Sequence, residues 1–84
     1  MTMYNNIIYI IRDKFIESGF NASAIGNSIY VSKSGRHSGY IWVFASCIRY
    51  RFSCLYLPDD NFISMDELDV KELIEIFNRG PLSN

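Results

Sequence analysis

The feature that most constrains the fold is a run of 18 residues, 40–57, that contains no Gly, Pro, Asn or Asp. Residues 40–44 (YIWVF) are all aromatic or β-branched, a composition typical of β-strands. One strand of 18 residues would exceed the usual length of about 3 to 10 residues. We therefore expect a turn or bulge near residues 46–48 and a further strand over residues 49–57.

A β-hairpin is predicted whose first strand precedes this run and whose second strand begins it. Residues 28–32 (SIYVS) alternate polar and apolar, which predicts a strand, and residues 34–39 are rich in the turn-forming residues Ser and Gly. They would join the strand to residues 40–44 through a loop with a basic tip. Residues 21–27 are small and polar and are predicted as a turn region.

Apolar residues recur at helical spacing near both ends of the chain, which predicts a helix at each end. Residues 5–18 are predicted as a helix, which Gly19 would end in a left-handed conformation, with Phe20 folded back toward Phe15. The apolar stripe of this helix consists of Tyr4, Ile7, Ile8, Ile11 and Phe15.

A second helix is predicted over residues 65–79, after a loop at residues 58–61. Ser64 and Glu67 have the spacing of a capping box, in which Ser64 accepts a hydrogen bond from the Glu67 amide and the Glu67 carboxylate accepts one from the Ser64 amide. Gly80, followed by a proline, would end this helix.

The fold class predicted from these elements is α+β: a helix, a three-stranded antiparallel sheet and a second helix (αβββα), with both helices on one face of the sheet. The 84 residues, 49% of them hydrophobic, predict a single domain spanning residues 1–84. At this size a stability of about 5 to 10 kcal/mol is expected, so a deep active site that excludes water would be a heavy demand.

The sheet can present either of two sets of side chains to the helices. If Ile29, Val31, Ile41 and Val43 point inward, the open face displays Tyr30, Tyr40, Trp42 and Phe44 beside Arg49 and Arg51. The alternative register buries the aromatic set. Alternation alone leaves both open.

Charge is distributed unevenly although the net charge is only −1. Residues 21–58 contain four basic residues and no acidic one, whereas residues 59–84 carry a net charge of −5. This pattern predicts a basic middle segment and an acidic surface on the second helix, formed by Asp69, Glu72 and Glu75.

Most catalytic chemistry is disfavoured by residue count and spacing. His37 is the only histidine, so His-paired nucleophiles and multi-histidine metal sites are excluded. The segment 34–39 lacks the spacing of phosphate-binding loops, and Cys47 and Cys54 are too few for a zinc site and are predicted as free thiols. We expect no metal, no cofactor and no enzymatic activity.

Aromatic residues interleaved with arginine are the most suggestive pattern for function. The predicted partner-binding residues are Tyr30, Arg36, Tyr40, Trp42, Arg49 and Arg51. Such a set suits single-stranded nucleic acid, because bases stack on rings, and the same residue types also form the main contacts of protein interfaces. Core packing in the alternative register is the third interpretation.

The helix, three strands, helix order is similar to the double-stranded RNA-binding fold and to the HicA family of small toxin ribonucleases. The RNA-binding fold implies a lysine-rich start to the second helix, where this chain has Asp66, Glu67 and Asp69. The HicA resemblance implies a catalytic histidine that follows a glycine on the first strand. Gly35-Arg36-His37 echoes it within the following turn, so His37 is the candidate of this alternative.

In size, polarised charge and lack of catalytic motifs the chain also resembles small single-domain proteins of phages and mobile elements, including anti-CRISPR inhibitors. This resemblance implies a non-enzymatic inhibitor or regulator that occludes a surface of a larger host complex, such as a CRISPR effector. A nucleic-acid-binding domain or small ribonuclease is the alternative function.

The remaining expectations concern partners and location. A protein partner is expected first and nucleic acid second, while Tyr9 and Ile16, on the back of the first helix, would serve a homodimer. The N-terminus lacks a signal-peptide pattern, and the uncharged stretch 39–48 is shorter than the roughly 20 residues that cross a bilayer. We therefore expect a cytoplasmic protein with no membrane contact.

Overall fold

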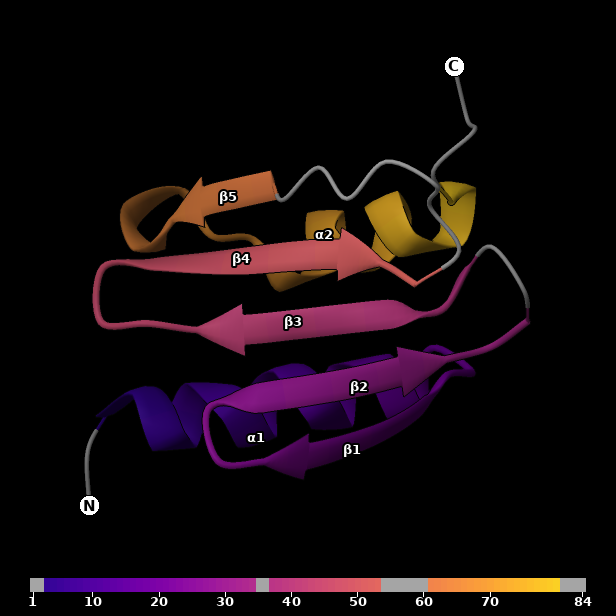
Figure 1. Ribbon diagram of the computed structural model, residues 1–84, viewed down its shortest axis with the longest axis horizontal. Helices are drawn as coiled ribbons and strands as arrows, with labels where there is room; N and C mark the ends of the chain where they lie inside the picture. Colours follow the sequence, from indigo (N-terminus) through magenta and orange to yellow (C-terminus); the bar gives the residue numbers. More distant parts are fainter. Residues whose placement is uncertain (1–2, 35–36, 54–60, 81–84) are drawn as a thin grey trace.

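The structure is a computed structural model that describes residues 3–34, 37–53 and 61–80. Five antiparallel strands form one sheet in chain order: β1 Asn21–Ile25, β2 Ser28–Ser32, β3 Gly39–Val43, β4 Cys47–Phe52 and β5 Asn61–Ser64. The helices are α1 Met3–Glu17, the 3-10 turn η2 Met65–Glu67, and α2 Val70–Arg79. Figure 1 shows α1 and α2 behind the sheet, on the same face.

The predicted three-stranded sheet is wrong, because β1 and β5 extend it at both edges. In β1 the inward side chains are Ala22 and Ala24, which pack against the core under α1. Because alanine is small and only weakly hydrophobic, the sequence of this strand predicts a polar turn region instead. β5 has only four residues and pairs Ile63 with Ile48 of β4. The α+β class and the helix at each end agree with the prediction.

The strand boundaries differ from the prediction mainly after β3. β2 has the predicted bounds, but the chain turns directly after Val43, where the Phe44 amide donates to the Cys47 carbonyl at 2.8 Å. The turn therefore precedes the expected position at residues 46–48. Of the strand predicted over residues 49–57, β4 covers the portion up to Phe52, and residues 54–57 lie outside the described part of the chain.

The capping box and the single long second helix are also wrong. Ser64 accepts a hydrogen bond from the Asp66 amide at 3.3 Å and so begins η2, after which Leu68 is extended. Asp69 is the residue that caps α2, accepting from the Lys71 amide at 3.0 Å. An Asp at this position competes with the upstream Ser as N-cap, because both side chains accept from amides two residues on.

The first helix ends as predicted. Gly19 has a φ of 96°, a left-handed conformation that favours glycine. The Phe20 amide donates to the Phe15 carbonyl at 3.0 Å, and the two rings meet edge to face with centroids 5.1 Å apart. The observed range, Met3–Glu17, begins and ends slightly before the predicted one.

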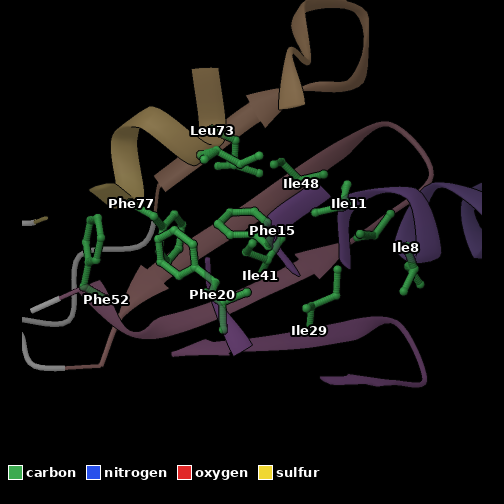
Figure 2. Close-up of a cluster of buried hydrophobic side chains, with 13 residues drawn as sticks. Ile8, Ile11, Phe15, Phe20, Ile29, Ile41, Ile48, Phe52, Leu73 and Phe77 are labelled. Atoms are coloured by element: carbon green, nitrogen blue, oxygen red, sulfur yellow. The ribbon is translucent and has the colours of Figure 1, made fainter. Parts of the chain in front are cut away.

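The core lies between the sheet and the two helices (Figure 2). Phe77 of α2 is fully buried against the rings of Phe15, Phe52 and Tyr50, with centroids 5.4, 4.8 and 5.8 Å away. Gly39 of β3 leaves room for this cluster, since a Cβ there would overlap the Arg51 carbonyl oxygen and lie 3.0 Å from the Phe77 ring. The other members include Ile8, Ile11, Phe20, Ile29, Val31, Ile41, Val43, Ile48, Leu73 and Ile74.

The sheet register places the aliphatic side chains toward the helices. Ile29, Val31 and Ile41 are fully buried. Tyr30 and Tyr40, which alternate with them, are 41% and 42% exposed on the opposite face. The first of the two registers left open by the sequence is therefore confirmed. Across the described residues, no helix is long and apolar enough to cross a membrane.

Candidate functional site

The candidate site is the open face of the sheet, which the helices leave uncovered. The strand register aligns its side chains in two rows that cross the sheet. One row runs from Tyr30 through Tyr40 to Arg51, and the other from Trp42 through Arg49 to Phe62. Of the predicted partner-binding residues, the structure brings together Tyr30, Tyr40, Trp42, Arg49 and Arg51; Arg36 lies outside the described residues.

The aromatic side chains of the open face contact one another. The rings of Tyr30 and Tyr40 lie 5.0 Å apart, and those of Tyr40 and Trp42 are stacked with a centroid distance of 5.7 Å and an interplanar angle of 22°. Contacts of this kind add about 0.5 to 1.5 kcal/mol beyond area burial. The rings therefore form a preordered surface and need little further ordering when a partner binds.

Arg49 lies over two rings of this surface. Its guanidinium carbon is 4.3 Å from the Trp42 ring centroid and 5.7 Å from that of Phe44. The Arg51 guanidinium is 6.0 Å from the Trp42 centroid. Cation–π attraction thus holds both charges against the aromatic surface.

The margin of the open face is strongly apolar. Ile25 at the end of β1 is 76% exposed, and Phe62 of β5 is 63% exposed. Sequence reasoning missed both, because Ile25 lies in the predicted turn region and Phe62 lies between the predicted loop and the predicted second helix. The available signal in NASAI was the alternation of polar residues with Ala22 and Ala24, whereas NFIS shows no alternation. Strands β1 to β5 contain no acidic residue, so the described open face is apolar with positive charge.

The predicted acidic surface lies on the other side of the molecule. Glu72 and Glu75 are exposed on α2, and Asp69 caps that helix. Because α2 packs on the opposite face of the sheet (Figure 1), these carboxylates do not join the open face. Tyr9 and Ile16 are about half exposed on α1, also away from the open face.

His37 has a structural partner. Its Nδ1 lies 2.9 Å from the carbonyl oxygen of Phe77, in the last turn of α2. A carbonyl oxygen only accepts, so Nδ1 carries the proton and donates. The imidazole therefore ties the loop between β2 and β3 to α2 instead of joining the arginines of the open face.

We expect His37→Ala to reduce the free energy of unfolding by about 1 kcal/mol, the usual contribution of one such hydrogen bond. Urea denaturation followed by circular dichroism measures the change. Ser34→Ala, in the same exposed loop, is the matched control and should alter stability by less than about 0.5 kcal/mol. Equal stability of the two variants would contradict a structural role for the imidazole.

Tyr50 of β4 points to the helix side, in contact with Phe52 and Phe77. Burial raises the pKa of its hydroxyl above the usual value of 10.0 for tyrosine; Arg79 lowers the pKa in part and Glu72 raises it. The folded protein therefore keeps this proton at a pH where the unfolded chain has lost it.

This shift predicts a loss of stability in alkali. Above a pH of about 10 the unfolded state binds fewer protons than the folded state, so the free energy of unfolding falls as the pH rises through the raised pKa. Urea melts at increasing pH should show a steeper decline for the wild type than for Tyr50→Phe. Parallel declines would show that Tyr50 does not cause the loss.

Two other features of the described residues carry no evident chemistry. A shallow groove of about 380 Å³ lies between the end of α1 and the start of α2, lined on opposite sides by Lys14 and Lys71. No group of three or more His, Cys, Asp or Glu side chains in the described ranges has metal-binding geometry. Cys47 is a free thiol, and Cys54 lies outside the described residues.

Comparison with protein-family models, with curated proteins and with solved structures finds no match to this chain. Its function must therefore be inferred from the open face itself.

Proposed function

We propose that the chain is a non-enzymatic binding module whose open sheet face contacts a partner protein. The observation that carries the proposal is the exposed, preordered aromatic surface with Arg49 and Arg51 laid against its centre. Trp, Tyr and Arg dominate the binding energy of protein interfaces, because they bury large areas with little loss of conformational freedom.

The arrangement of Trp42 favours protein over nucleic acid. Proteins that hold single strands offer the faces of aromatic rings for bases to stack on. Here the Trp42 ring is stacked near Tyr40 and has the Arg49 guanidinium 4.3 Å from its centroid. A base would have to displace this arginine, whereas a flat apolar protein surface would cover the arginine and the ring together.

Charge defines the expected partner more closely. Strands β1 to β5 carry Arg49 and Arg51 and no acidic side chain. A complementary surface would be apolar where it meets Tyr30, Tyr40 and Phe62 and would carry no basic side chains beside the two arginines.

The mechanism that suits so small a domain is occlusion. Binding through one face covers a functional surface of a larger complex without any chemical step. This is the mode implied by the resemblance to phage-type inhibitors, and a host effector complex is the class of target it implies. The acidic side chains of α2, Glu72 and Glu75, form a second surface that would remain outside the first contact.

The test compares the immobilised wild type with the double variant Trp42→Ala/Arg51→Glu in lysate of the cells that naturally contain the chain. A protein should be retained by the wild type and lost with the double variant. The matched control, Glu72→Gln/Glu75→Gln, alters the opposite side of the molecule and should retain the same protein.

Nucleic acid is the alternative outcome of the same experiment. If the open face holds a single strand, the retained material absorbs as nucleic acid, and its retention falls steeply as the salt concentration rises. A gel-shift assay at low salt with RNA and single-stranded DNA then gives a complex that Arg49→Glu weakens. Retention of the same protein by the folded double variant would contradict the proposed site.

A further inference from the structure

Strand β1 forms an edge of the sheet, since among the described strands it pairs only with β2. Its five residues, NASAI, include no charged residue and no proline. Natural sheets usually protect such an edge with lysine, proline or a bulge, because unpaired backbone groups attract another strand. β1 has none of these devices.

The register identifies which backbone groups point outward from β1. Ile25 and Ser28 flank a two-residue turn whose Gly26 has a φ of 59°, so they form a hydrogen-bonded pair. Hydrogen-bonded and non-hydrogen-bonded pairs alternate along an antiparallel ladder. The N–H and C=O groups of Ala22 and Ala24 therefore point away from β2, toward the edge.

One flank of α1 lies on the same side of the molecule. Lys14 lines the groove shared with α2, so the flank that carries Tyr9 and Ile16 faces away from α2. Because α1 contacts β1 and β2 whereas α2 lies behind β4 and β5, that flank is on the β1 side (Figure 1). Tyr9 and Ile16 are 50% and 49% exposed there.

The middle of β1 lies level with the middle of the exposed flank of α1, measured along the strand and the helix. The chain reverses between Glu17 and Asn21, and Ser23 lies about 7 Å beyond Asn21 along the strand. The midpoint between Tyr9 and Ile16 also lies about 7 Å from Glu17 along the helix. A two-fold axis through the edge at Ser23 would therefore pass level with the middle of the helical flank.

We propose that two copies of this chain pair through their β1 edges across such an axis, which gives one continuous sheet with the two α1 helices packed antiparallel beneath it. The backbone N–H and C=O groups of Ala22 in each copy then form hydrogen bonds with those of Ala24 in the other copy. Tyr9 meets Ile16 of the second copy. The helix axes lie about two strand spacings apart, roughly 10 Å, the usual distance of packed helices.

At the centre of this interface, the two-fold axis would bring charges of opposite sign from the two copies together. Arg12 and Asp13 are ion-paired at 2.9 Å and lie at the midpoint of the flank. The same axis brings Arg12 near Asp13 of the second copy, so opposite charges meet. The other edge, β5, is less suitable, because the acidic residues Asp66 and Glu67 follow it directly and would repel their symmetry mates.

Light scattering over a series from micromolar to millimolar concentration tests the dimer on the purified chain, independently of any partner of the open face. The wild type should approach twice the monomer mass. Ser23→Lys would set two ammonium groups beside the axis and should raise the dimer dissociation constant by at least about tenfold. Ser23→Thr, which adds no charge, should leave the dimer intact.

A matched pair on α1 tests the helix layer. Ile16→Glu should weaken the dimer, whereas Ile10→Glu should not, because Ile10 is equally exposed but lies on the other flank. Circular dichroism checks that each variant is folded. A wild type that is monomeric at millimolar concentration, or a dimer unaffected by both Ser23→Lys and Ile16→Glu, would overturn the proposal.

Discussion

Replacing Phe77 with alanine is expected to lower the free energy of unfolding by about 3 to 5 kcal/mol. The ring is fully buried and joins α2 to α1 and β4 through contacts with Phe15 and Phe52. A domain of this size has roughly 5 to 10 kcal/mol of stability in total. The variant should therefore be largely unfolded well below the melting temperature of the wild type.

Thermal and urea denaturation followed by circular dichroism measure this loss. Phe62→Ala is the matched control, because the same ring is removed from a side chain that is 63% exposed. It should change stability by less than about 1 kcal/mol. Equal losses in the two variants would mean that Phe77 is not at the centre of the core.

Replacing Trp42 with alanine should weaken partner binding by at least about thirtyfold, the effect of losing an interface residue worth about 2 kcal/mol. Trp42 stacks with Tyr40 and supports the guanidinium of Arg49. Its loss removes buried area and also releases the arginine from its position. Surface plasmon resonance with the captured partner gives the ratio of dissociation constants.

Trp42→Phe is the conservative counterpart. It keeps an aromatic ring in place for Arg49 and should retain most of the affinity. Both variants should remain folded, because Trp42 lies outside the buried core. The alanine variant loses the stacking with Tyr40, worth about 0.5 to 1.5 kcal/mol of stability. Full affinity of the alanine variant would show that binding does not pass through the open face.

The sequence predicts most reliably where large side chains alternate or recur at helical spacing. Residues 28–32 form β2 as expected, and the inward set of Ile29, Val31 and Ile41 is buried. The alternation divides the side chains of each strand into two sets, and the structure shows that the aliphatic set is the buried one. The same alternation predicts that Tyr30, Tyr40 and Trp42 share one face of the sheet, but it leaves open whether that face is exposed.

The edges of the sheet could not be predicted from apolar content. Ala22 and Ala24 supply a core contact suited to close packing under α1, but alanine is neither a strong strand former nor a strong apolar signal. β5 is held mainly by pairing with β4, an interaction between residues distant in sequence. Consequently Ile25 and Phe62, at the margin of the open face, were missed.

The start of α2 shows how two local signals compete. Ser64 and Asp69 are both good N-caps, and each accepts a hydrogen bond from an amide two residues on. The structure uses Ser64 for η2 and Asp69 for the helix. Which cap begins the longer helix depends on where Leu73 and Phe77 must lie to reach the core, and this is decided by tertiary packing.

Site-specific photo-crosslinking tests most directly whether the open face is the binding surface. A photoreactive phenylalanine analogue would replace Tyr40 on the open face or Glu75 on the exposed side of α2, in otherwise identical protein. The account predicts that the protein captured by the wild type becomes covalently linked from position 40 and not from position 75. Crosslinking from position 75 alone would contradict it.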